Sequence, residues 1–200
     1  MPRRLVLVII GLVAIDALLI APAHAVGEAS RFIEQLGNQV LDIYRNAEIP
    51  PSEQENRLYA IAVKSFDVPR IARSVLGRYW AQATPGERDE FTKVFEHYMV
   101  HLYAERFSQY RNVRFRAVRE SSSAPGRTVV QTEIVRPGDP QPVRVDWLVG
   151  QEEGAFKIID VNIEGVSQLL TLREEFGTVL QRNEGRVSAL TAQLREKTRR

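Results

Sequence analysis

The chain reads FKIIDVNIEGVS from Phe156 to Ser167, and this stretch carries more information about the fold than any other. Its first eight residues are rich in β-branched and aromatic side chains, which favours a strand. Gly165 can adopt backbone angles that other residues avoid, so the strand should break there and a helix should follow from Val166. Ile158 and Ile159 are neighbours that point to opposite faces, which predicts a strand covered on both sides.

Three further strands precede this one. From Val113 the apolar period becomes two, and strands are also predicted over 128–135 and 143–149. In the last of these, apolar side chains at alternate positions such as Val145 and Trp147 share one face. The connections are short and rich in turn residues, so the four strands should form an antiparallel meander.

Four helices are predicted before the sheet. Apolar residues three and four positions apart indicate helices over 28–45 and 53–65. Asp67 can cap a short third helix that ends at Gly77. Thr84 opens a capping box, and with it a long fourth helix. The apolar face of that helix is formed by Phe91, Val94, Phe95, Tyr98, Met99, Leu102, Tyr103 and Phe107.

The beginning of the chain has the layout of a secretory signal. Arg3 and Arg4 precede an apolar run over 5–20, and a small-x-small pattern ends at Ala25, where we expect cleavage. A retained membrane anchor is disfavoured because the run is shorter than the roughly 20 residues needed and contains Asp16. The chain has no cysteine, which excludes a disulfide framework and a lipoprotein attachment site.

Residues 26–200 are expected to form one domain. Removing 1–25 takes away two arginines and one aspartate, so the formal charge falls from +2 to +1 and gives little support for nucleic-acid binding. Helices precede the sheet and helices follow it, an order typical of an α+β domain. The chain ends in a basic amphipathic tail, which is either a solvated end or a surface attracted to anionic membranes or to a transporter; its basic residues are Arg195, Lys197, Arg199 and Arg200.

Three blocks of sequence occur in a recognisable order and spacing. They comprise Phe66-Asp67, Ile71-Ala72-Arg73, Leu76-Gly77 and Trp80; then Thr84-Pro85, Arg88, Phe91 and Phe95; and finally Lys157 to Ser167 with Glu175-Phe176 and Leu190 to Leu194. Over essentially the whole mature chain these blocks resemble the MlaC family, also described as toluene-tolerance auxiliary proteins. Asn162 and the arginine-rich end depart from the commonest pattern of that family, and they bear on the cargo rather than on the fold.

The resemblance implies an α+β fold in which N-terminal helices pack on one curved, four-stranded antiparallel sheet of the NTF2/cystatin-like type. C-terminal helices and an internal apolar cavity complete the expected domain. The implied function is a periplasmic, non-enzymatic carrier that shuttles phospholipid between the outer and inner membranes and maintains outer-membrane lipid asymmetry. The implied partners are an inner-membrane ABC transporter with a hexameric substrate-binding ring and an outer-membrane lipoprotein bound to a porin. In the hopanoid-associated HpnM group the cargo would be a polycyclic lipid.

Large apolar residues are the candidates for contact with an acyl chain, although such residues more often form ordinary core. No cofactor other than bound lipid is expected. The candidate lipid-binding residues are Phe66, Val75, Trp80, Phe91, Phe95, Tyr98, Met99, Tyr103, Val145, Trp147, Ile158 and Val161.

Two other kinds of protein are compatible with the same pattern. One is a small enzyme on a curved sheet, with Asp146 or Asp160 as a base acting on an apolar substrate. Asp146 is expected on the strand face opposite Val145 and Trp147, which disfavours this role. The other is a binding adaptor whose core is filled and has no cavity.

Two polar features have simpler structural explanations. His97 and His101 are four residues apart and Glu105 extends the row, but two ligands on one helical turn do not make a metal site, so a polar helix edge is expected. Glu164, beside Gly165, is interpreted as an acceptor for a backbone turn rather than a general base.

Overall fold

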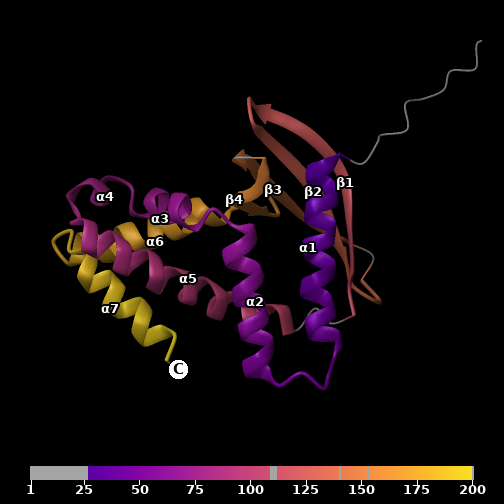
Figure 1. Ribbon diagram of the computed structural model, residues 1–200, viewed down its shortest axis with the longest axis horizontal. Coiled ribbons are helices and arrows are strands. Elements are labelled where there is room, and N and C mark those ends of the chain that lie inside the picture. The colour runs from indigo at the N-terminus through magenta and orange to yellow at the C-terminus, as the bar shows by residue number, and fades with distance from the viewer. Residues whose placement is uncertain (1–26, 109–111, 140, 153, 200) are drawn as a thin grey trace, which may run out of the picture.

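The computed structural model describes residues 27–108, 112–139, 141–152 and 154–199, so the predicted signal segment lies outside the described residues (Figure 1). The elements are α1 (Glu28–Arg45), α2 (Pro51–Ser65), α3 (Val68–Leu76), α4 (Arg78–Gln82), α5 (Pro85–Ser108), β1 (Arg114–Ala124), β2 (Arg127–Val135), β3 (Val143–Glu152), β4 (Ala155–Ile163), β5 (Val166–Ser167), α6 (Gln168–Arg182) and α7 (Val187–Lys197). This order confirms the predicted α+β class. None of the described helices is both long enough and apolar enough to cross a bilayer.

The strands form one antiparallel sheet in the order β1-β2-β3-β4-β5. The four predicted strands are present, and β5 adds a short fifth strand because the chain reverses at Glu164 and Gly165, which have φ of 50° and 82°. Val166 therefore pairs with Ile163 instead of starting a helix. The helix α6 begins only after Ser167, whose hydroxyl accepts the N–H of Leu170 at 3.1 Å.

The register divides the sheet into two faces. Val130 lies opposite Trp147, and Trp147 lies opposite Val161, so these side chains share the inner face, toward α1. Ile158 is on this face and Ile159 is on the outer face. Both are buried, with exposed fractions of 0 % and 6 %, which confirms that β4 is covered on both sides.

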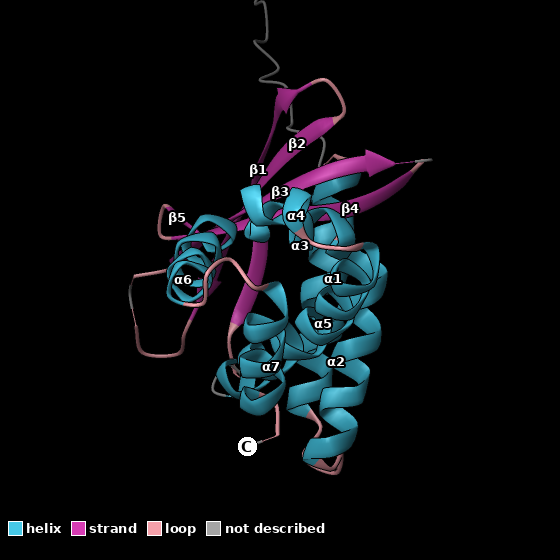
Figure 2. Ribbon diagram, turned by 90° about the vertical axis from the view of Figure 1, so that its left-hand side faces the viewer, coloured by secondary structure: helices cyan, strands magenta, loops and turns pink. Residues whose placement is uncertain are grey.

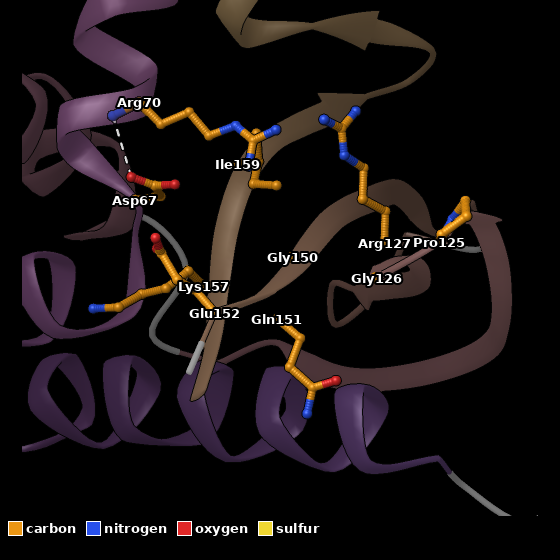
Figure 3. A pocket seen from close by; sticks show the side chains of 10 residues that line it. All are labelled: Asp67, Arg70, Pro125, Gly126, Arg127, Gly150, Gln151, Glu152, Lys157 and Ile159. Carbon is orange, nitrogen blue, oxygen red and sulfur yellow. Dashed lines mark hydrogen bonds between the residues drawn. The ribbon is translucent and has the colours of Figure 1, made fainter. Parts of the chain in front are cut away.

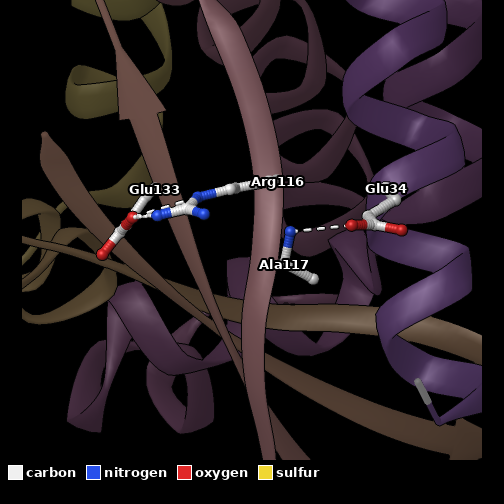
Figure 4. Close-up of polar contacts among 4 residues, drawn as sticks. All are labelled: Glu34, Arg116, Ala117 and Glu133. Atoms are coloured by element: carbon white, nitrogen blue, oxygen red, sulfur yellow. Dashed lines mark hydrogen bonds and ion pairs between the residues drawn. The ribbon is translucent and has the colours of Figure 1, made fainter. Parts of the chain in front are cut away.

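The helix α1 crosses the edge strand β1 at close range. Gly37 makes this possible, because a Cβ at that position would lie 2.4 Å from the ring of Phe115. Glu34 accepts the backbone N–H of Ala117 at 2.9 Å, beside a register shift in β1 (Figure 4). The helix thus covers part of the sheet edge, where unpaired N–H groups could recruit another strand. On the outer face Arg116 and Glu133 form an ion pair at 2.6 Å.

The helices α3 to α7 form a second packing unit. The elements α4 and α7 lie at the end of the molecule farthest from the β1–β2 hairpin (Figure 1), and α7 packs along α5 while α3 packs along α6. Figure 2 shows the lower parts of α2, α5 and α7 together, below most of the sheet. The ring of Phe176 lies edge-on to Phe91 and Phe95, with centroids 6.2 and 6.1 Å away. These rings form the centre of the helical core.

The predicted caps of α3 and α5 are confirmed in detail. The Asp67 carboxylate accepts the N–H of Arg70 at 3.1 Å. Thr84 and Glu87 bond to each other reciprocally, and the backbone and hydroxyl of Thr84 lower the pKa of Glu87. The short helix α4 was not predicted. Its five residues are too few to show a helical period, although Gly77, with φ of 53°, correctly marks the end of α3.

Candidate functional site

Two aromatic side chains, Trp147 and Phe115, pack together on the inner face of the sheet. The indole N–H of Trp147 donates to the hydroxyl of Thr132 at 2.9 Å, and this hydroxyl donates to the carbonyl of Val145 at 3.0 Å. The ring of Phe115 meets the indole edge-on, with centroids 6.3 Å apart. Thr132 is fully buried and Trp147 is only half-buried, so the indole is held in place while part of its apolar surface stays accessible.

Two apolar clusters meet at Phe66. One is the helical core of α3 to α7, and the other joins α1 to the inner face of the sheet; Phe66 packs against both. The chain passes beside β4 here, because Phe66 bridges Ile158 and the N–H of Asp67 donates to the carbonyl of Ile158 at 2.9 Å. The boundary between the two clusters is therefore fixed at one end by backbone pairing.

Most candidate residues from the helices lie deep in the helical core. Val75, Phe91, Phe95 and Tyr98 are at most 6 % exposed. Trp80 lies on α4, with the Arg88 guanidinium over its ring at 5.5 Å, and it packs on the helical core. Their contacts are those of structural core, and their role in lipid contact stays a prediction.

The candidates from the sheet lie together on the inner face. Ile158 and Val145 are buried, with 0 % and 4 % exposure, whereas Trp147 and Val161 are half-buried. Ile163 is next to Val161 on the same face, opposite Val145, and was not among the predicted site residues. The two-residue alternation through Val161 was the signal that could have identified it.

Tyr103, a half-buried candidate from α5, contacts the start of α6; Met99, the other half-buried candidate on this helix, packs on the helical core. The hydroxyl of Tyr103 donates to the Gln168 side chain at 3.3 Å, and the N–H of Leu169 donates to the Asp160 carboxylate at 3.1 Å, so the start of α6 is tied to both α5 and β4. We use the name apolar seam for a set of half-buried apolar residues drawn from the two clusters and from their neighbours in the chain. It comprises Met99, Leu102, Tyr103 and Leu169 from the helices and Trp147, Val161 and Ile163 from the sheet.

Two hollows open on the outer side of the sheet. The first, of about 300 Å³, includes Arg70, Arg127 and Ile159 (Figure 3). The second, of about 530 Å³, includes Asp146 and Asn162. Both have many polar side chains, and neither is the apolar cavity that we expected between the helices and the sheet. That cavity stays a prediction.

The family model of the MlaC protein matches residues 34–196. The chain belongs to the MlaC family. Among solved structures, this MlaC-family chain is similar to a phospholipid-binding protein from Ralstonia solanacearum, whose structure was determined in complex with a phospholipid. The TM-score is 0.74 at 22 % sequence identity, and the match covers 86 % of this chain and 97 % of the other. At this identity the comparison establishes a common fold.

The two aspartates considered as enzymatic bases have different surroundings. Asp160 accepts the hydroxyl of Ser167 at 2.6 Å in addition to the N–H of Leu169, so its carboxylate organises the β5–α6 corner. Asp146 lies on the outer face, as predicted. Glu164 accepts the N–H of Arg144 and donates its own N–H to the carbonyl of that residue, which confirms its predicted role in a turn.

The histidine row on α5 contacts α2. His97 stacks on Tyr59 with ring centroids 4.7 Å apart, and Nδ1 of His101 lies 3.6 Å from the Glu55 carboxylate. The side chain of Glu105 lies outside the described residues. Within the described part of the chain, no group of three potential metal ligands comes together.

Proposed function

We propose that this protein binds a phospholipid with its acyl chains against the apolar seam and carries it through the periplasm. Membership of the MlaC family carries the proposal, since a solved structure with the same fold holds a phospholipid. The seam supplies the physical basis, because it combines half-buried apolar side chains from α5 and α6 with those of the inner sheet face. Acyl chains would displace water from these surfaces.

The energetic need for such a surface is large. Two acyl chains contain about 30 methylene groups, and at about 0.8 kcal/mol each their exposure to water would cost on the order of 24 kcal/mol. A carrier must therefore bury the chains nearly as well as a bilayer does. If the two environments are close in free energy, contact with a partner can tip loading into unloading.

The proposed transport connects the two membranes. The partners would be an inner-membrane ABC transporter with a substrate-binding ring and an outer-membrane lipoprotein–porin complex, and the outcome would be maintained outer-membrane lipid asymmetry. The signal-like segment at the start of the sequence supports export to the periplasm. The structural engagement of Asp160 supports a carrier rather than an enzyme.

The two tryptophans allow the binding site to be located. In a Trp80→Phe protein only Trp147 emits, and phosphatidylglycerol with brominated acyl chains should quench it on binding. In a Trp147→Phe protein only Trp80 emits, and its position on α4, at the end of the molecule away from the β1–β2 hairpin, should keep it from being quenched. Equal quenching of both tryptophans, or of Trp80 alone, would remove the seam as the binding site.

A transfer assay tests the carrier role. The protein should accelerate movement of fluorescent phosphatidylglycerol from donor to acceptor vesicles separated by a dialysis membrane that only the protein can cross. A protein that binds the lipid but does not accelerate transfer would be a lipid store. Selective uptake of a hopanoid would assign the cargo to the polycyclic class.

A further inference from the structure

The first outer hollow lies between the start of α3 and the turn that joins β1 to β2. Arg127, Gly150 and Lys157 occupy one row across β2, β3 and β4, and the buried Ile159 stands beside Gly150. The Ile159 side chain lies over Gly150, where a Cβ would come within 2.7 Å of it, and both residues line a hollow of about 300 Å³ (Figure 3). Since Ile158 and Ile159 lie on opposite faces, β4 separates the hollow from the apolar seam.

Two guanidinium groups face this space from different elements. Arg70 extends from α3 and Arg127 from β2, and Figure 3 shows the Arg70 guanidinium beside Ile159 and the Arg127 guanidinium to the right of it. Neither arginine forms an ion pair with any carboxylate in the described part of the chain. Two cations with a common open space and no intervening anion favour an anionic ligand.

The other charged groups of the hollow lie toward its opposite side. The Asp67 carboxylate accepts the N–H of Arg70 as a helix cap, and Nζ of Lys157 donates to the carbonyl of Lys64 at 2.6 Å. In Figure 3 the carboxylates of Asp67 and Glu152 lie on the same side as Lys157. One side of the hollow therefore has charges of both signs. The other side, which we call the cationic side, has only the guanidinium groups of Arg70 and Arg127.

We propose that the cationic side binds a phosphate oxyanion, held between Arg70 and Arg127. A guanidinium group donates two parallel N–H bonds to a pair of oxygens. A carboxylate has only two oxygens and is satisfied by one such fork, whereas a tetrahedral phosphate offers oxygens to two forks at once. The phosphate would come from the free anion or from a phospholipid headgroup at a membrane surface. This site is separate from the proposed lipid-carrying seam.

The test uses the mature protein and three ligands at constant ionic strength: sodium phosphate, sodium acetate, and vesicles of phosphatidylcholine with or without phosphatidylglycerol. Binding is followed by nuclear magnetic resonance of the arginine Nε–H groups and by co-sedimentation. Arg70→Gln and Arg127→Gln should each weaken binding about tenfold or more, since each removes a charge-assisted contact. Arg182→Gln is the matched control, because Arg182 is an exposed arginine at the C-terminal end of α6 and does not line the hollow.

Two results support the proposal and identify the source of the phosphate. Saturable shifts of both Nε–H groups with sodium phosphate indicate the free anion. Vesicle binding that needs phosphatidylglycerol and both arginines, without a response to sodium phosphate, indicates the headgroup. The proposal is overturned if neither sodium phosphate nor the vesicles bind. It is also overturned if Arg182→Gln weakens binding as much as Arg70→Gln and Arg127→Gln do, or if acetate binds as well as phosphate. The last result would point to an acidic protein partner. Seam-dependent lipid binding is read separately by Trp147 quenching.

Discussion

The indole N–H of Trp147 and the hydroxyl of Thr132 lie 2.9 Å apart on neighbouring strands, and this bond fixes the largest side chain of the inner sheet face. Because Thr132 is fully buried, no water can replace its hydroxyl. Thr132→Val keeps the side-chain shape but leaves the indole N–H unpaired, so we expect a loss of about 1–3 kcal/mol in the free energy of unfolding.

Urea unfolding and the fluorescence of Trp147 measure this effect. Thr178→Val is the control, because Thr178 is exposed on α6 and its substitution should change stability by no more than about 0.5 kcal/mol. If the two variants were equally stable, the bond would have no part in holding the indole.

The crossing of α1 over β1 predicts an unusual effect of a helical glycine. Gly→Ala in a helix interior normally stabilises by up to about 1 kcal/mol. At Gly37 the added methyl group would meet the ring of Phe115 at 2.4 Å, so Gly37→Ala should destabilise the protein by about 1–3 kcal/mol. Gly177→Ala on α6 should stabilise it, since nothing lies within 4 Å of the new Cβ. Opposite signs for the two substitutions in denaturant melts are the expected result.

Burial of Tyr44 makes stability sensitive to alkaline pH. Burial, with a smaller contribution from Glu55, raises the pKa of Tyr44 to about 12. The unfolded pKa is about 10, so the stabilisation is complete below about pH 10 and is lost as the pH rises toward about 12. Tyr44→Phe should reduce the slope of stability against pH in this interval. An unchanged slope would assign the alkaline loss to other groups, such as Tyr59, whose pKa is raised by burial and by Glu96.

The β5–α6 corner should depend on the Asp160 carboxylate. Asp160→Ala leaves the Ser167 hydroxyl and the N–H of Leu169 without their acceptor, and we expect a loss on the order of 2 kcal/mol with faster amide exchange at the start of α6. Asp146→Ala, on the outer face, is the control. If both substitutions reduced the free energy of unfolding equally, the Asp160 carboxylate would have no special part in holding this corner.

The apolar seam should be separable from the core by mutation. Phe95 is 1 % exposed, so Phe95→Ala should cost about 3–5 kcal/mol and reduce the amount of folded protein. Trp147→Ala removes a half-buried surface of the seam, and it should reduce phospholipid bound per folded molecule more than Phe95→Ala does. Phosphorus analysis of the folded fraction, isolated by gel filtration, makes the comparison. The reverse order would place the lipid in the helical core.

Periodicity predicted the strongly amphipathic elements and their caps, because the residues that set them are local in sequence. The Asp67 cap, the Thr84–Glu87 box and the alternation through Val145 and Trp147 are examples. The elements that were missed, α4 and β5, are too short to show a period. The turn at Glu164, which creates β5, depends on pairing with Arg144 some twenty residues away.

The division between core and candidate site was not predictable from periodicity. Phe91 and Met99 belong to the same apolar stripe, yet Phe91 is fully buried and Met99 is half-buried. Trp80 and Trp147 are the same residue type, but Trp80 packs on the helical core and Trp147 lies on the inner sheet face. These differences arise from how the helices pack on one another and on the sheet. Contacts of that kind join segments distant in sequence, and a local pattern does not record them.

Native mass spectrometry of the protein purified from the cells that produce it, followed by solvent extraction of the ligand, tests the central claim most directly. We predict a mass increment of about one phospholipid per chain, which Trp147→Ala reduces and Trp80→Phe does not. A protein that is isolated empty, and that stays empty after incubation with phospholipid vesicles, would contradict the carrier function.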